Sequence, residues 1–321
     1  YPQEFGFGLL QSQKAGFAWS LCIVKERGVA MTSLRSLSDV LVCAFLIVVT
    51  VGIGTTVFRS GPKDLRASTT RNLGKVGQAC NLYAVDHGGR YPMSMSYNSI
   101  NKVWRTNSMI RTPAGWAVGT SSVEPRRTEE AQAWSNALFA YGMNRTSYQV
   151  AGGLSFFNLG TAGKTAEPAL IGINMNGLAH TFDQASVQSP SSFPAFWTGM
   201  GANNVIGGAI HNPSLNCPTA NLPCLYRPKQ WPQDSSNGAF FFFVQCGPSG
   251  ARQSSRVHGL DALYVTQDGS VGAWPMGLVS KPEATDRSND PFSPYNPGGV
   301  CPGGYHWDGW YPWLFRPDYM P

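Results

Sequence analysis

The longest apolar run of the chain covers residues 40–58, VLVCAFLIVVTVGIGTTVF, and these 19 residues include no charged side chain. As an α-helix the run would be roughly 28 Å long, about the thickness of the hydrocarbon core of a bilayer. A core helix of this length normally shows a polar face, and a cleaved signal peptide ends in small residues, which do not follow here. The pattern therefore predicts a transmembrane anchor over residues 35–60, with Asp39 and Phe58 at its ends and Val48 near its centre.

A second hydrophobic pattern begins directly after the predicted anchor. Its apolar side chains recur at spacings of three, four and eight, which indicates an amphipathic α-helix. This stripe consists of Leu65, Leu73, Val76, Cys80 and Tyr83. Pro62 suits the first turn of a helix, and the pair Gly88-Gly89 suits its end. We expect residues 61–92 to join the anchor to the rest of the chain through this helix.

From residue 93 onward the apolar residues mostly follow the period of β-strands. One more helix is expected over residues 128–141, with Thr128 as its N-cap. Short apolar runs between Gly, Pro and Asn predict strands, of which the last two are joined by the turn QDGS at 267–270. The expected strands cover residues 169–174, 193–197, 239–245, 262–266 and 271–274. The chain is thus predicted to be an α+β protein with a β-rich head over residues 93–321.

Composition and motifs narrow the function of this head. Charged residues make up only 13% of the chain, whereas it contains 36 Gly and 23 Pro, a composition that suits β-structure outside the cytoplasm. The net charge of +6 comes without a long basic run, so nucleic-acid binding has little support. Gly163-Lys164-Thr165 ends like a phosphate loop, but Asn158 stands where that loop needs Gly. Hydrolase motifs and metal-ligand spacings are also missing, so we expect no catalytic residue, no metal and no cofactor.

The cysteines carry one specific prediction. Cys217 and Cys224 close a short loop that contains two prolines, and a disulfide between them would suit an oxidising compartment. Half of a zinc site is the alternative, but no second pair of ligands lies nearby in the sequence. The pairing of Cys80, Cys246 and Cys301 is left open.

Aromatic side chains gather in the N-terminal arm, residues 1–34, and in the C-terminal tail, residues 291–321. Aromatic residues with few Lys or Glu neighbours favour a buried contact surface, either with a partner or with the head itself. Stacking on a sugar is the alternative use of the tail. The candidate contact residues are Phe5, Phe7, Phe17, Trp19, Trp307, Trp310 and Trp313.

Three stretches of the chain together resemble a known family. The segment LSDVLVCAFLIVVTVGIG, followed by RASTTRNLGKVGQACNLYAVDHGGRYP, resembles the start of type IV pilin-like and pseudopilin-like proteins. The most similar group is the prepilin-type set of planctomycete-type bacteria, named for a His, a nine-residue spacer and an Asp-Gly. His258 and, nine spacer residues later, Asp268-Gly269 match that name, and residues 172–199 resemble the family's strand, loop and S-P-S turn. The remaining matches are Asn72, Leu73, Gly74, Gly77, Tyr83, Asp86, Gly89, Tyr91 and Pro92.

The resemblance implies a pilin-like architecture, in which a long N-terminal helix is membrane-embedded in its first half and packs on an antiparallel sheet. His258, Asp268 and Gly269 are then interpreted as a structural turn motif and not as a catalytic or metal site. The family carries Gly, then an aromatic residue or Met, then an early Glu, where this chain has Leu34, Arg35 and Asp39. The processing signal is thus lost, and we expect the arm to be retained, although a start at Met31 is the alternative.

These features predict a non-enzymatic, single-span accessory subunit of the bacterial inner membrane, with its head in the periplasm or outside the cell. Its partners would be the bilayer and the other subunits of a larger membrane complex, such as a respiratory or photosynthetic one. The first alternative is a pilin or pseudopilin subunit that associates with its own kind in a filament. The second is a carbohydrate-binding surface protein, and calcium or glycan binding by the head is left open.

Overall fold

The chain divides into two compact units, Tyr1–Arg59 and Ser60–Pro321, and everything described below belongs to the second. The computed structural model describes residues 62–106, 108–119, 122–158, 163–199, 201, 203–215, 217, 224–227, 239–241, 261–275, 306–307 and 313–320. The predicted anchor and the aromatic residues of the N-terminal arm lie outside these ranges. Within them, no helix combines the length and the apolar character needed to cross a membrane.

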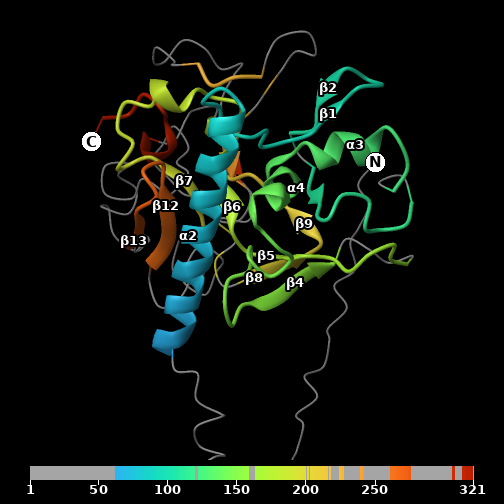
Figure 1. The fold of residues 1–321 in the computed structure, drawn as a ribbon, viewed down its shortest axis with the longest axis horizontal. Coiled ribbons are helices and arrows are strands. Elements are labelled where there is room, and N and C mark those ends of the chain that lie inside the picture. The colour runs from blue at the N-terminus through green and yellow to red at the C-terminus, as the bar shows by residue number, and fades with distance from the viewer. Residues whose placement is uncertain are drawn as a thin grey trace, which may run out of the picture. The chain divides into compact units, whose positions relative to one another are not determined.

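The predicted amphipathic helix is confirmed as α2, Pro62–Asp86, which runs along the head in Figure 1. Leu73, Val76 and Cys80 from the predicted stripe are buried in the main hydrophobic core. The helix ends where predicted, because Gly88 and Gly89 follow it with φ values of +65° and +77°, which glycine adopts without a steric penalty.

The sheet beneath α2 has the strand order β13-β12-β7-β6, and all of its neighbouring strands are antiparallel. These strands are β6 (Asn174–Met175), β7 (Pro194–Trp197), β12 (Asp261–Thr266) and β13 (Val271–Pro275). Because side chains alternate between the two faces of a strand, β12 contributes residues to two hydrophobic cores. Leu263 and Val265 join the core that contains α2, whereas Ala262 and Tyr264 belong to a second core that also contains Trp197. The helix and this sheet therefore form a two-layer unit.

Two polar side chains fix α2 to loops of the head in addition to this packing. Asn72 donates to the carbonyl oxygen of Gln149 at 3.0 Å, and Asn81 donates to that of Gln267 at 3.3 Å. Close packing also requires small residues on the helix. A Cβ atom at Gly77 would lie 2.6 Å from a methyl carbon of Val265, so only glycine fits this approach without a shift.

The head was predicted to carry an antiparallel sheet, and its described strands divide among five sheets, one of which includes a parallel pair. β4 (Leu154–Asn158) and β8 (Asn203–Ile206) are parallel, and β5 (Leu170–Ile171) is antiparallel to β8. The pairs β1–β2 and β3–β9 are formed by β1 (Tyr97–Asn98), β2 (Val103–Trp104), β3 (Ile110–Arg111) and β9 (Gly208–Ala209). The last sheet contains β10 (Ser214–Leu215), β11 (Ala239–Phe241) and β14 (His306–Trp307).

The continuous helix predicted over residues 128–141 is wrong. It is replaced by α3 (Arg126–Ala131), α4 (Trp134–Ala137) and the 3-10 helix η1 (Leu138–Tyr141). The break falls at Ala133, whose extended backbone (ψ 153°) pairs with Met93, while Trp134 N donates to the Met93 carbonyl at 2.8 Å. Thr128 is not the N-cap, because α3 begins two residues earlier. Burial of Ala133 and Trp134 in the core outweighs the continuity of the helix.

The strand predicted over residues 169–174 is also two elements, β5 and β6, which belong to different sheets. Between them Gly172 N and Ile173 N both donate to the carbonyl oxygen of Tyr148, at 2.9 and 3.0 Å, which turns the chain out of the first sheet. The predicted hairpin is confirmed, since β12 and β13 pair and Gly269 has φ +87° in their turn.

The described part of the C-terminal tail packs on its own head. The 3-10 helix η6 (Trp313–Phe315) begins with Trp313, and the side chains of Leu314 and Phe315 are buried in the second core. Phe315 lies 5.0 Å from Trp197 between ring centroids, and Arg316 forms an ion pair with Asp318 at 2.7 Å. Self-packing, one of the three uses considered for the tail, is thus observed for this segment. Trp307 lies in β14, and Trp310 falls outside the described residues.

Candidate protein-interaction site

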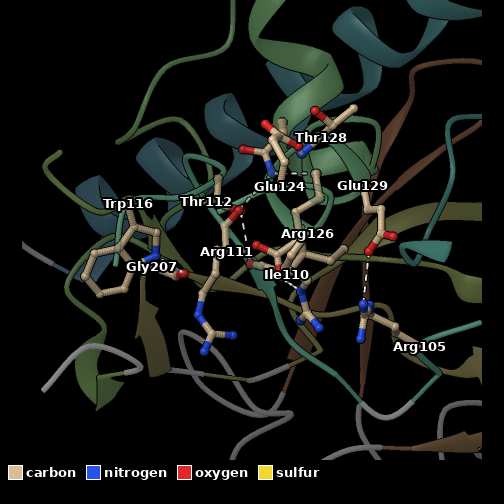
Figure 2. A network of polar contacts seen from close by, with 12 residues as sticks. Arg105, Ile110, Arg111, Thr112, Trp116, Glu124, Arg126, Thr128, Glu129 and Gly207 are labelled. Carbon is tan, nitrogen blue, oxygen red and sulfur yellow. Dashed lines mark hydrogen bonds and ion pairs between the residues drawn. The ribbon is translucent and has the colours of Figure 1, made fainter. Parts of the chain in front are cut away.

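Arginine and glutamate side chains form a polar network around α3, shown in Figure 2. Glu129 and Glu130 are adjacent residues of α3, and the first turn of the same helix supplies Arg126. Arg105 follows β2, and Arg111 is the last residue of β3. Three guanidinium groups from separate segments therefore surround two carboxylates on one helix.

Glu129 is the better satisfied of the two carboxylates. Its Oε1 accepts from the backbone N and the hydroxyl of Ser99 at 2.7 and 2.6 Å, and its Oε2 accepts from Arg105 Nη2 at 2.9 Å. Burial raises its pKa, but the bonds from Ser99 and the charge of Arg105 outweigh burial, so the pKa of Glu129 lies below its usual range. The side chain is ionised at neutral pH and joins α3 to the β1–β2 hairpin.

Glu130 accepts fewer hydrogen bonds than Glu129, although its side chain is entirely buried. Arg126 Nε donates to its Oε1 at 2.5 Å across one helical turn. Its Oε2 has no hydrogen-bond partner among the described residues. Burial raises the pKa of Glu130 above its usual range, and Arg126 and Arg111 oppose the rise only in part.

Arg111 is the arginine of this network without an ion-pair partner in the described part of the chain. Its Nε is buried and has no hydrogen-bond partner there, and in Figure 2 the side chain extends between Trp116 and Arg126 with no dashed line at its guanidinium. The Nε atom of Arg105 is also buried and has no hydrogen-bond partner among the described residues. The network thus offers two cationic N–H donors for which the described residues supply no acceptor.

Exposed apolar side chains flank these arginines in the sequence. Four of the large exposed hydrophobic residues fall between positions 100 and 123, namely Ile100, Val103, Val118 and Val123. Their exposed fractions are 72, 40, 50 and 58%. Arginine together with exposed apolar residues is a composition typical of protein–protein contact surfaces. We name Arg105, Arg111 and Arg126 the arginine cluster.

A second polar cluster contains two histidines, His180 and His211, and both are fully buried. Ser94 donates its backbone N–H to His180 Nδ1 at 2.9 Å, so the neutral ring carries its proton on Nε2. His211 Nε2 lies 2.7 Å from the hydroxyl of Ser214, which donates to the carbonyl of Thr106 at 3.0 Å and thus accepts from the ring. A Ser–His contact can activate a nucleophile, but this one is closed to solvent in the structure.

Of the residues predicted to form a turn motif, Asp268 and Gly269 are described and His258 lies outside the described residues. Asp268 accepts from Ser270 N at 2.9 Å and from the hydroxyl of Thr266, which lowers its pKa. Both bonds are local to the hairpin. No group of three or more metal-ligating side chains is found within the described part of the chain.

The predicted cysteine pair is joined in the structure. The sulfur atoms of Cys217 and Cys224 form a disulfide, with 5.6 Å between the Cα atoms. Cys80, in contrast, is a free thiol buried between α2 and the sheet, and burial raises its pKa well above the usual range.

Neither the arginine network nor the buried histidines was predicted from the sequence. The run RRTEE at 126–130 did carry a signal, because Arg126 and Glu130 have the i, i+4 spacing of a helical ion pair. The contributions of Arg105 and Arg111 depend on tertiary contacts and leave no local signal. His180 and His211 are 31 positions apart, so their spacing resembled no known ligand motif.

Comparisons with known proteins add no family to this description. No protein-family model matches the chain, and no curated protein or solved structure shows significant similarity to it.

Proposed function

We propose that the chain is a single-span structural subunit whose head stabilises a larger membrane protein complex. The observation that carries this proposal is the continuity between the uncharged stretch 40–58 and the helix α2. Pro62, the first residue of α2, follows Phe58 by only four positions, so at most about 14 Å of extended chain can separate them. If the stretch lies in a bilayer, the start of the head is held close to the membrane surface.

The way in which α2 is built into the head supports this role. Its buried stripe and the hydrogen bonds of Asn72 and Asn81 join it to the sheet and to two loops. The helix next to the predicted anchor is therefore an integral part of the folded head. The disulfide between Cys217 and Cys224 suits an oxidising compartment on the outer side of the membrane.

The described histidines and carboxylates also favour a structural role over catalysis. His180 and His211 have no exposed surface, Asp268 serves the hairpin turn, and Glu129 holds α3 to the neighbouring hairpin.

Extraction of the native membranes with a mild detergent tests this function. The proposal expects the full-length chain to migrate on a native gel with other membrane proteins at a fixed ratio. A homopolymer whose chains are trimmed to Arg35 or Ser36 and N-methylated would overturn the proposal in favour of a pilin-like filament. Migration as a single chain that is retained on a glycan column would overturn it in favour of a carbohydrate-binding protein.

A further inference from the structure

We propose that Asn144 is a site of N-linked glycosylation, where the side-chain amide nitrogen receives a sugar from an activated glycosyl diphosphate. The sequence Asn144-Arg145-Thr146 has the acceptor pattern, which is Asn, any residue except Pro, and then Ser or Thr. The inference goes beyond the proposed function and rests on it only for the compartment, because this modification belongs to surface segments of proteins that leave the cytoplasm. The observations that carry it are the sequence motif, the exposure of its residues and the hydrogen bonds of the Asn144 amide.

The acceptor pattern occurs once in the full sequence, at Asn144. Asn212-Pro213-Ser214 has the same first and last residue types, but the proline between them blocks the pattern. The side chain of Asn212 is also fully buried, so a transferase could not reach it in the folded head. The chain therefore offers a single candidate site.

The structure presents this site at the surface of the head. The motif lies between η1 and β4, and all three of its residues, 144–146, are exposed. Met143 and Tyr148 on either side of it are buried, and Leu170 N donates to the carbonyl oxygen of Arg145 at 3.1 Å. The backbone of the motif is thus fixed to the start of β5, while its side chains remain accessible to an enzyme.

Hydrogen bonds also orient the amide group of Asn144. Its Oδ1 accepts from the backbone N of Thr146 at 3.0 Å and from the hydroxyl of Thr146 at 2.9 Å. A backbone N–H can only donate, so the amide atom that faces Thr146 must be the oxygen. Nδ2, the atom that would carry the sugar, therefore lies on the side of the amide group away from these two bonds.

The proposed step is a group transfer without oxidation or reduction. A bond forms between Nδ2 of Asn144 and the anomeric carbon of the sugar. The bond from that carbon to a diphosphate oxygen breaks, and the diphosphate leaves with the electron pair. Nδ2 loses one proton to a base of the transferase, so one N–H remains on the glycosylated amide.

A glycan at Asn144 would also limit where the head contacts other subunits. Attached glycans are bulky and keep a surface in water. The face of the head around residues 144–146 would therefore stay exposed in the complex, and the contacts with partner subunits would use other faces.

Mass spectrometry of the full-length chain, purified from its native membranes, tests the site. We expect the peptide that contains Asn144 to carry sugar, and fragmentation should place the sugar on that residue. An amidase that releases N-linked glycans in heavy-oxygen water should leave a labelled aspartate at the same position. Lipid-linked and nucleotide-linked sugars both carry the diphosphate leaving group. An attached oligosaccharide indicates a lipid-linked donor and a single sugar a nucleotide-linked one, and either result supports the site.

Variants made in the same organism separate the motif from the fold. Asn144→Gln and Thr146→Ala should both lose the sugar, whereas Thr146→Ser keeps the hydroxyl group and should keep the sugar. Asn101→Gln is the matched control, because Asn101 is also exposed but has no Ser or Thr two positions later. Thermal melting of each variant reports whether the head is folded, and the wild-type measurement decides the matter even if a variant is unstable.

An unmodified Asn144 in the wild-type chain from native membranes would overturn this inference. Sugar that maps to serine or threonine residues instead, or full modification of Asn144 in the Thr146→Ala variant, would also reject it. If Asn144 is unmodified while the chain migrates with other membrane proteins, the site is rejected and the proposed function stands. A chain that is glycosylated at Asn144 but migrates alone would reject the proposed function and leave the site.

Discussion

The buried pair His180 and His211 makes the stability of the head depend on pH. Burial and, to a smaller extent, the nearby His211 together lower the pKa of His180 from 6.5 to about 3. Burial likewise lowers the pKa of His211 to about 4, although the carbonyl groups of Thr106 and Ser94 oppose the shift. Protonation of His180 at Nδ1 would also end the bond that this atom accepts from Ser94 N. Both rings are therefore neutral in the folded protein at pH values at which they are charged in the unfolded chain.

The size of the effect follows from linkage. Below pH 6.5 the unfolded state binds more protons than the folded state, so stability falls as the pH falls. A pH of 5 is about 1.5 units below the ordinary pKa of histidine. This difference corresponds to a loss of about 2 kcal/mol in the free energy of unfolding for each of the two groups. Together the pair should lower the free energy of unfolding by about 4 kcal/mol between pH 7.5 and pH 5. That is a large part of the roughly 5–15 kcal/mol typical of a folded domain.

Urea unfolding of the full chain in detergent, followed by tryptophan fluorescence at several pH values, measures this dependence. His180→Asn is the informative variant, because its Oδ1 replaces Nδ1 as acceptor for Ser94 N and does not titrate. Its stability should be lower at neutral pH but should fall by only about 2 kcal/mol on acidification. His87→Gln, at an exposed position, is the control and should keep the full slope. An identical slope in His180→Asn and wild type would refute the reasoning.

Three further predictions concern the fold. Gly77→Ala should lower the free energy of unfolding by about 1–3 kcal/mol, because its Cβ would lie 2.6 Å from a valine methyl carbon. Gly74→Ala, whose Cβ would have its nearest contact at 3.8 Å, should instead be neutral or stabilise by up to about 1 kcal/mol, and equal effects of the two would contradict this packing. Gly269→Val should destabilise the head by about 1 kcal/mol or more through its φ of +87°, and an unchanged urea midpoint would speak against it. Mass spectrometry without reductant should find Cys217 and Cys224 joined; free thiols or bound zinc would reject the disulfide.

The parts of the fold that the sequence predicted correctly are those fixed by local periodicity and turn chemistry. The stripe through Leu73, Val76 and Cys80 identified α2, and the turn at Gly269 identified the last hairpin. The disulfide between Cys217 and Cys224 was predicted from the short spacing of the two cysteines. In each case the deciding interactions lie within a few residues of one another or repeat along one helix.

The predictions that were wrong or missing concern residues whose structure is decided by tertiary contacts and not by local sequence preference. The helix predicted after Thr128 is broken at Ala133, because that residue pairs with Met93 about forty positions earlier. The arginine cluster was missed for the same reason, since Arg105 and Arg111 approach α3 only after the chain has folded. Membrane insertion of residues 40–58 stays a prediction of the sequence alone, because that segment lies outside the described residues.

Retention in the membrane tests the central claim, which is that the stretch 40–58 holds a folded structural head at a bilayer. The full-length chain should stay in the membrane fraction after an alkaline carbonate wash. Val48→Arg should reduce this retention, because an arginine at the centre of a spanning helix costs about 2.5–3.5 kcal/mol. Recovery of the wild-type chain in the soluble fraction without detergent would contradict the account.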